Sequence, residues 1–187
     1  KLIIATPSPF SRKARVALRE KNIDFEEIID VPWNKNTLTK NINPLGKIPI
    51  LLHKNSEPLF DSRVIVQYLD KFKPQPLMYP ENHEDNISAK LVEAVADGVC
   101  DAIVLVFLEN ARKKNLRSKN WIERQETKIF EGVGYLSSFL QENKYFVGNK
   151  FNISDVSSFS CFDYLDLRFS KLQWRNQYSN LKKYWDV

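Results

Sequence analysis

The 187-residue sequence contains few of the residues that build disulfide scaffolds or metal sites: two cysteines, two histidines and one methionine. Two cysteines are too few for a disulfide framework, and neither they nor the histidines show zinc-ligand spacing. Cys100 and Cys161 lie in apolar, helix-like segments. We therefore expect buried free thiols in a cytoplasmic protein, and no bound metal. No apolar run approaches the ~18 residues of a membrane helix, so we expect no membrane association.

Positive charge is confined to the first part of the chain. The net charge is +5. Residues 1–74 hold 13 Lys and Arg against 8 Asp and Glu, whereas residues 75–187 hold 15 of each. A basic domain suits an anionic ligand, although a solvated surface explains the same charge without one. The lysines are scattered rather than grouped in a stripe, which disfavours nucleic acid as a partner.

The first 74 residues alternate between strand and helix patterns. Ser8 and Pro9 predict a helix start, with Ser at the N-cap and Pro at the first helical position. A second helix opens at Ser62. The remaining predicted elements are strands at 2–4 and 24–30, a loose helical segment at 34–43, and strands at 48–52 and 58–60 joined as a hairpin by a polar turn at 54–56. The predicted order is βαβ, then a helix, then ββα.

The pattern breaks after residue 74, where two prolines and a polar stretch predict a linker over 75–85. No convincing strand follows in residues 86–187, so we expect an all-helical domain there. The periodicity over 86–143 predicts two long helices separated near 115–118.

Local signals refine the predicted helical domain. Asn152 and Asp155 have the spacing of a capping box, which predicts another helix start. Three glycines lie within the two long predicted helices: Gly98, Gly132 and Gly134. We expect them to allow close packing.

Four stretches, taken together and in this order, are similar to a known family. They are Ser8–Arg15, Asn43–Leu51, Asp61–Leu69 and Phe151–Asp155. The sequence resembles the cytosolic glutathione transferases over essentially its whole length, and looks closest to a bacterial serine-using subgroup related to the theta, phi and zeta classes. The resemblance implies a thioredoxin-like glutathione-binding domain over 1–74 and an all-α bundle domain over 86–187. It also implies a homodimer that uses glutathione as co-substrate in detoxification.

The resemblance assigns two of these stretches to the binding of glutathione. Ile48 and Pro49 would be joined by a cis peptide bond, which costs little before proline. The backbone of Ile48 would then pair with the tripeptide as an added strand does. At the next predicted helix, the backbone and hydroxyl of Ser62 would hold the γ-glutamyl carboxylate while Asp61 takes the ammonium group. The family usually has Glu where this chain has Asp61, and simple helix capping explains both residues as well.

The resemblance assigns further residues to the glycine end of glutathione and to the electrophile. By position, Lys35 matches a contact to the glycine carboxylate of glutathione, and Lys47 is a second candidate; both could equally be solvated lysines. Phe10, Trp33 and Phe107 are candidates to line the electrophile pocket, although tryptophan in core packing is an equal alternative for Trp33.

Ser8 matches the family's activating serine, whose hydroxyl donates to the glutathione sulfur and favours the thiolate. The N-terminus of the helix adds a field of the same sign. Ser11, three residues later, is the competing candidate and could also face the substrate pocket. Capping the helix is the structural alternative for Ser8.

The predicted activity is attack of the glutathione thiolate on a hydrophobic electrophile. Conjugation, peroxidase, dehalogenase and isomerase chemistry all begin with that thiolate. Two alternatives stay open. One is a thiol reductase of the omega or glutaredoxin type, which serine at position 8 disfavours. The other is a non-enzymatic interaction protein of the same fold, like the stringent starvation proteins.

Overall fold

The computed structural model describes residues 1–54 and 57–186, and the chain divides into two compact units, Lys1–Tyr79 and a second that begins at Pro80. The division falls inside the stretch 75–85. The first unit contains β1 (Leu2–Ile4), α1 (Pro9–Glu20), β2 (Glu27–Ile29), α2 (Thr39–Ile42), β3 (Ile50–Leu51) and α3 (Ser62–Phe72). The second contains α4 (His83–Ala111), the 3₁₀ turn η1 (Lys114–Leu116), α5 (Lys119–Leu140), α6 (Ile153–Arg168), α7 (Trp174–Gln177) and α8 (Ser179–Trp185).

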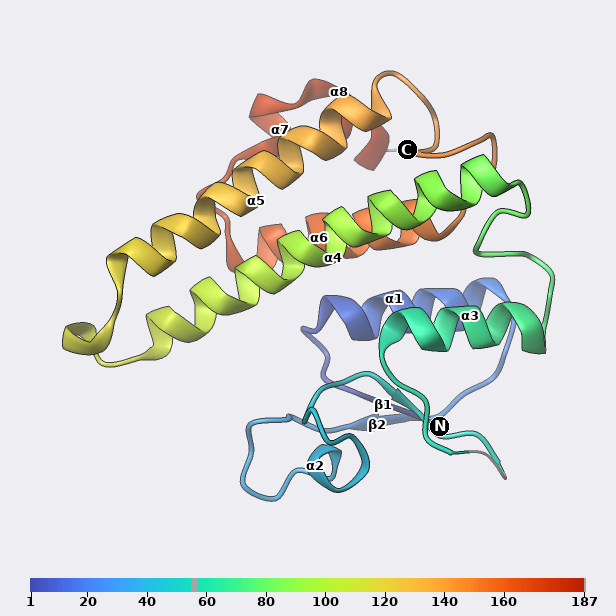
Figure 1. Ribbon diagram of the computed structural model, residues 1–187, viewed down its shortest axis with the longest axis horizontal. Coiled ribbons are helices and arrows are strands. Elements are labelled where there is room, and N and C mark those ends of the chain that lie inside the picture. Colours follow the sequence, from blue (N-terminus) through green and yellow to red (C-terminus); the bar gives the residue numbers. More distant parts are fainter. Residues whose placement is uncertain (55–56, 187) are drawn as a thin grey trace. The chain divides into compact units, whose positions relative to one another are not determined.

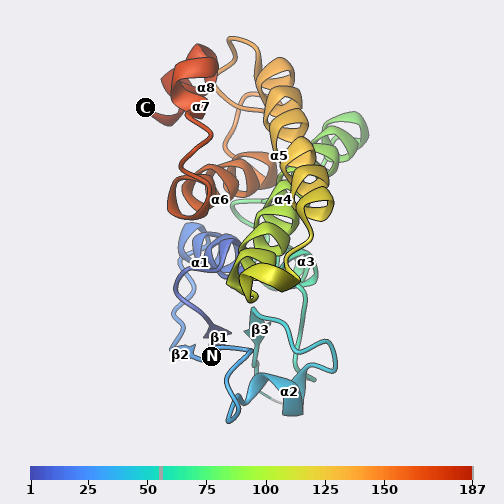
Figure 2. The same ribbon diagram turned by 90° about the vertical axis from the view of Figure 1, so that its left-hand side faces the viewer.

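A small mixed sheet organises the first unit. Its strand order is β2-β1-β3, with β1 parallel to β2 and antiparallel to β3. The three apolar residues of β1 are at most 1% exposed, which accounts for its central position. Helices α1 and α3 pack against each other on one face of this sheet, and α2 lies on the opposite face (Figures 1 and 2).

The strand predictions for this unit were too long. Within the segment 24–30, only Glu27–Ile29 forms a strand. The predicted second strand of the hairpin is reduced to a single bridge, in which Leu51 and Leu59 exchange backbone hydrogen bonds of 2.9 and 3.0 Å. Residues 55 and 56 of the predicted turn lie outside the described residues.

The helical prediction over 34–43 was also too long, because tertiary hydrogen bonds hold its first part in another conformation. Asp30 accepts hydrogen bonds from the side chains of Thr37 and Thr39 and from the backbone of Thr39. These bonds fix the chain as a loop up to Leu38, and the helix α2 begins only at Thr39.

The second unit is helical, as predicted. Helix α4 packs against both α5 and α6 (Figure 1). The predicted break between the two long helices falls at residues 112–118 and contains η1. The capping box is confirmed: Asn152 caps α6 through the backbone N–H of Ser154, and the Asp155 carboxylate accepts the backbone N–H of Asn152, both at 3.0 Å.

The expectation of close packing holds for only some of the glycines. A Cβ added at Gly132 would lie 2.4 Å from a methyl group of Val99, so only glycine lets α5 approach α4 here. At Gly98 the described residues leave open space, so no other part of the described chain packs closely against it. That position lies on the exposed side of α4.

None of the helices formed by residues 1–54 and 57–186 combines the length and the apolar character needed to cross a membrane.

Candidate functional site

The sheet register brings the predicted site residues of the first unit to one edge. In the antiparallel pair β1–β3, Ile3 lies opposite Ile50. Continuing this register places Pro49 beside Ile4, at the end of β1. A turn closed by the Ser8 N–H and the Ala5 carbonyl at 3.0 Å then leads into α1. The start of α1 and the Ile48–Pro49 dipeptide therefore share one edge of the sheet.

The start of α3 reaches the same edge. Leu59 is bridged to Leu51 in an antiparallel sense. Two residues further along the chain, the same register brings Asp61 level with Pro49. Asp61 is the N-cap of α3. Two helix N-termini, each with a partial positive charge, therefore flank the proline.

Ser8 is the N-cap of α1, as predicted. Its Oγ accepts a hydrogen bond from the backbone N–H of Ser11 at 3.2 Å. This bond uses an oxygen lone pair and leaves the hydroxyl proton to donate elsewhere. Ser8 is half-buried. One side chain can thus cap the helix and also donate to a ligand, so the structural and functional interpretations are compatible.

Ser11 is more deeply buried than Ser8. It is only 1% exposed, and its Oγ has no hydrogen-bond partner among the described residues. Ser11 is therefore less accessible to a solute than the half-buried Ser8. The geometry therefore favours Ser8 over Ser11 as the residue that meets a bound thiol.

The Ile48–Pro49 bond is cis, which confirms that prediction. The loop before it is shaped by Asn43, which the sequence analysis missed. The Asn43 amide donates to the carbonyl of Lys47 at 2.8 Å, and its side-chain oxygen accepts the Leu45 N–H at 2.9 Å. Gly46 has φ +60°, a conformation that glycine adopts without steric cost. An Asn before proline with glycine two residues later is a turn signal that could have pointed to this role.

At α3, the side chain of Asp61 accepts the backbone N–H of Arg63 at 3.0 Å. Asp61 is exposed, whereas Ser62 is 2% exposed. The peptide bond between Phe60 and Asp61 is also cis. A helix N-terminus binds carboxylates through its free N–H groups, and a carboxylate at the cap suits an ammonium group. This edge can therefore hold both charges of a zwitterionic amino-acid end.

Trp33 and Lys35 lie in the loop that Asp30 holds in place. The Asp30 carboxylate lies 2.6 Å from the hydroxyl oxygens of Thr37 and Thr39 and 2.9 Å from the Thr39 nitrogen. Burial raises the pKa of Asp30, but these hydrogen bonds outweigh it, so the pKa lies below its ordinary value. Trp33 is 63% exposed, which excludes the core-packing alternative, and Lys35 is exposed.

The remaining predicted residues are more scattered. Lys47 is exposed and Phe10 is half-buried, both in the first unit. Phe107 belongs to the second unit, on α4, and is half-buried. Within the described part of the chain, no cluster of three or more His, Cys, Asp or Glu could hold a metal ion. Both cysteines are free and buried.

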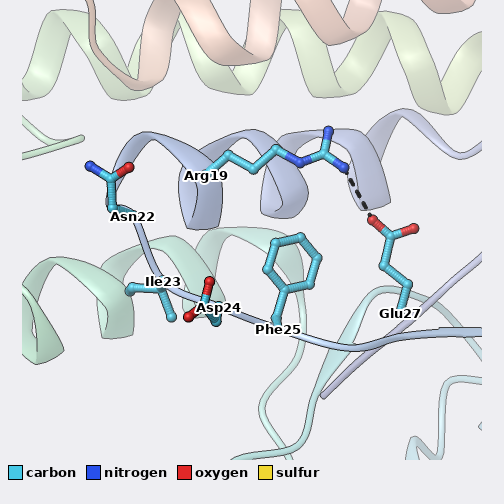
Figure 3. Close-up of a pocket in the computed structure, with 6 residues that line it drawn as sticks. All are labelled: Arg19, Asn22, Ile23, Asp24, Phe25 and Glu27. Atoms are coloured by element: carbon cyan, nitrogen blue, oxygen red, sulfur yellow. Dashed lines mark hydrogen bonds and ion pairs between the residues drawn. The ribbon is translucent and has the colours of Figure 1, made fainter.

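A surface hollow of about 630 Å³ lies where α1 ends and β2 begins (Figure 3). Arg19 extends along it to Glu27, whose carboxylate also pairs with Arg15 at 2.8 Å. It contains none of the predicted site residues. Arg15 therefore has a structural role in the first unit, as one member of an ion pair.

Comparison with known protein families decides the assignment. Residues 7–71 match the model of the glutathione S-transferase N-terminal domain, and residues 97–187 match that of the C-terminal domain. The chain belongs to the glutathione S-transferase family. The thioredoxin-like first unit and the helical second unit are those of the family, which confirms the predicted fold class.

Similar proteins of the family come from several bacteria. An uncharacterized GST-like protein, YibF of Escherichia coli K12, is 32% identical over 90% of this chain and 83% of its own length. A glutathione S-transferase of Methylobacterium radiotolerans JCM 2831, solved with glutathione sulfonate, is 37% identical, with a TM-score of 0.96 over 99% of this chain and 87% of that one. A glutathione S-transferase of Methylobacillus flagellatus KT, solved with glutathione bound, is 36% identical, with a TM-score of 0.95 over 99% and 92%.

Proposed function

We propose that the protein is a glutathione transferase in which the Ser8 hydroxyl donates to the sulfur of bound glutathione and favours its thiolate. The observation that carries this proposal is the convergence of three features at one sheet edge. These are the half-buried serine at the start of α1, the cis Ile48–Pro49 bond, and the start of α3 at Asp61. The glutathione compounds bound by the two solved relatives support it.

Each end of the tripeptide has its partners in this proposal. The Ile48 backbone pairs with the middle of the tripeptide as an added strand. The Ser62 end of α3 holds the γ-glutamyl carboxylate, and Asp61 takes the ammonium group. The exposed Lys35 and Lys47 attract the glycine carboxylate.

The thiolate then attacks a hydrophobic electrophile, which we assign to the aromatic side chains of Phe10, Trp33 and Phe107. Trp33 and the two half-buried phenylalanines offer aromatic surface that solvent can reach. This chemistry suits the detoxification of electrophiles. We place the protein in the cytoplasm, where the free thiols of Cys100 and Cys161 stay reduced.

The decisive experiment is a pH titration of thiolate absorbance with bound glutathione. A hydrogen bond to a charged group contributes roughly 1.5–3 kcal/mol. At 1.36 kcal/mol per pKa unit, Ser8→Ala should raise the pKa of the bound thiol by about one to two units. Ser11→Ala is the matched control and should leave that pKa unchanged. The stability of Ser8→Ala must be measured in parallel, because loss of an N-cap costs about 0.5–2 kcal/mol.

The outcomes separate the alternatives. If the pKa of the bound thiol rises only in Ser11→Ala, then Ser11 and not Ser8 is the activating residue. Failure of the wild-type protein to bind immobilised glutathione would favour a non-enzymatic interaction protein. Ser8→Cys should permit a mixed disulfide with glutathione and introduce thiol-transfer activity, which the wild type should lack. Strong thiol-transfer activity in the wild type would contradict this assignment.

We also propose that the protein is a homodimer. One face of α4 displays exposed residues at heptad spacing, and all of them except Asp101 are apolar or small: Ile87, Leu91, Ala94, Gly98, Asp101, Leu105 and Leu108. Such a stripe is typical of a helix that packs against a partner. The small residues at its centre would let that partner approach closely.

A further inference from the structure

The neutral second half of the chain contains a separation of charge. Residues 109–124, where α4 ends and α5 begins, hold six Lys and Arg against two Asp and Glu. The remainder of residues 75–187 holds nine against thirteen. The cations of the turn are concentrated further, because five of them fall within eight consecutive residues: Arg112, Lys113, Lys114, Arg117 and Lys119. The second unit therefore has one strongly basic end.

This basic end, which we call the α4–α5 turn (residues 109–124), is also rich in exposed apolar surface. It lies at the end of the α4–α5 pair, away from α7 and α8 (Figures 1 and 2). Every residue from 110 to 121 is exposed. Two of them are large and apolar: Leu116 is 53% exposed and Trp121 is 41% exposed. Cations beside an exposed aliphatic and an exposed aromatic side chain are typical of surfaces that adsorb to anionic lipid.

Hydrogen bonds give the α4–α5 turn a defined shape. The Glu109 carboxylate accepts two bonds from the Arg112 guanidinium, at 2.9 and 3.0 Å, and one from the Ser118 N–H at 2.7 Å. Arg117 donates through Nε to the carbonyl of Arg112 at 2.9 Å. The end of α4 is thereby tied to the start of α5. Because the backbone is already ordered, presenting the lysines of the turn to a partner costs little conformational entropy.

We propose that the α4–α5 turn is a docking surface for a bilayer of anionic phospholipid. Its Lys and Arg side chains meet the headgroup phosphates, while Leu116 and Trp121 enter the boundary between headgroups and acyl chains. A nucleic acid would satisfy the cations, but its phosphate backbone offers no apolar partner for Leu116. The expectation of no membrane association rests on the lack of a spanning segment, which adsorption to the surface does not require.

This docking surface does not depend on the proposed transferase function. One cation near an anionic bilayer strengthens binding about fivefold, and salt screens that attraction beyond ~8 Å at physiological ionic strength. Binding should therefore be reversible and sensitive to salt. It would bring the protein to a phase in which apolar compounds accumulate.

Co-sedimentation of the full chain with lipid vesicles tests the charge. The wild type should bind vesicles made of equal parts of phosphatidylcholine and phosphatidylglycerol at low salt, and should not bind vesicles of phosphatidylcholine alone. The triple variant Lys113→Gln/Lys114→Gln/Lys119→Gln should bind the mixed vesicles roughly a hundredfold more weakly, since it lacks three cations.

A second triple variant removes the same charge elsewhere in the second unit. Lys144→Gln/Lys150→Gln/Lys182→Gln changes exposed lysines of the loop after α5 and of α8. It should bind the mixed vesicles within about twofold of the wild type, because cations far from the bilayer are screened. Both variants should keep the melting temperature of the wild type.

Tryptophan fluorescence tests the apolar contact. Mixed vesicles should shift the emission of the wild type to shorter wavelength as an indole leaves water. Trp121→Phe keeps an aromatic ring and should bind as the wild type does, but it should lose most of this shift. The variant identifies the responsible indole among the four tryptophans of the chain.

Several results would overturn the docking surface. They are equal wild-type binding to both kinds of vesicle, binding to neither, equal losses in the two triple variants, and a full emission shift in Trp121→Phe. Wild-type binding to duplex DNA without binding to the mixed vesicles would also overturn it, and would assign the turn to nucleic acid. The wild-type comparison of the two lipid compositions decides the question even where a variant fails to fold.

Discussion

At the scale of the residue, Asp30 shows how one carboxylate positions a candidate binding loop. Its backbone N–H joins β1 through the carbonyl of Ile4 at 2.8 Å, and its side chain fixes Thr37 and Thr39. The loop between these anchors carries Trp33 and Lys35. The positions of both candidate ligand contacts thus depend on a residue that need not touch the ligand.

Replacing Asp30 should reveal the stability that its ionised form provides. Because the folded-state pKa is lowered, this stability is present above the unfolded-state pKa of about 3.9 and is lost as pH falls through the folded-state pKa. Asp30→Asn should therefore lower the free energy of unfolding by about 1 kcal/mol at pH 7, since solvent partly screens the carboxylate. The difference from wild type should shrink below about pH 4.

Urea unfolding at a series of pH values measures this difference. Asp24→Asn, at an exposed aspartate, is the matched control and should stay within about 0.5 kcal/mol of wild type at every pH. A difference between Asp30→Asn and wild type that grows as the solution is acidified would contradict the assignment.

At the scale of the element, a buried lysine joins the end of α1 to α3 and the segment that follows α3. Lys21 is fully buried, and its Nζ lies 2.7 Å from the Asp70 carboxylate. It also donates to the carbonyls of Lys73 at 2.8 Å and Pro76 at 2.7 Å. Asp70 in turn accepts the N–H groups of Met78 and Tyr79. This network satisfies the buried ammonium group and fixes the chain up to residue 79.

Removing one member of the buried pair should be costly. Lys21→Met should lower the free energy of unfolding by about 3–5 kcal/mol, because it leaves the Asp70 charge without its cation. Lys71→Met, at an exposed lysine of α3, is the control and should cost less than about 0.5 kcal/mol. Denaturant unfolding checks both.

A double-mutant cycle identifies the pair as the cause. Lys21→Met combined with Asp70→Asn should cost clearly less than the sum of the two single changes. Additive losses would mean that the two side chains stabilise the fold independently, through their separate hydrogen bonds to the backbone.

At the scale of the whole molecule, the net charge belongs to the first unit and the exposed apolar stripe belongs to α4. The charge bears on the binding of glutathione, which carries a net negative charge. Screening limits the reach of such a field to ~8 Å at physiological ionic strength. The stripe bears on association of the chain with a second copy.

The charge argument predicts salt-sensitive binding of glutathione. Lys35→Glu should weaken binding several-fold at low salt, with a smaller effect at high salt, because the exposed lysine acts mainly through its field. Lys183→Glu, in the neutral second unit, is the matched charge reversal and should have little effect. Titration calorimetry at two ionic strengths measures both, and equal effects would contradict the assignment of Lys35.

The stripe predicts that Gly98→Arg converts a dimer into a monomer. The described residues leave the space around Gly98 open, and replacing glycine within a helix does not weaken the helix. The variant should therefore fold as a monomer with a cooperative melting transition, while losing the dimer in light scattering at micromolar concentration. Asn110→Arg, exposed on α4 but off the stripe, should remain dimeric. A monomeric wild type would refute the homodimer.

The sequence by itself determined the features that depend on neighbouring residues. Ser8 and Pro9 begin α1, and Asn152 and Asp155 form the capping box of α6. In each case the residues that make the decisive hydrogen bonds lie within one helical turn. The resemblance of four short stretches extended these local signals to the fold and to the Ile48–Pro49 bond.

The tertiary structure alone decided which side chains are buried and which long-range bonds replace a local preference. Asp30 ended a predicted helix through bonds to residues seven and nine positions away. Lys21 is fully buried, and its ammonium group donates to carbonyls more than fifty residues further along the chain. The depth that separates Ser11 from Ser8 has the same origin. A one-dimensional pattern does not encode these distances, because burial depends on every segment that packs around a residue.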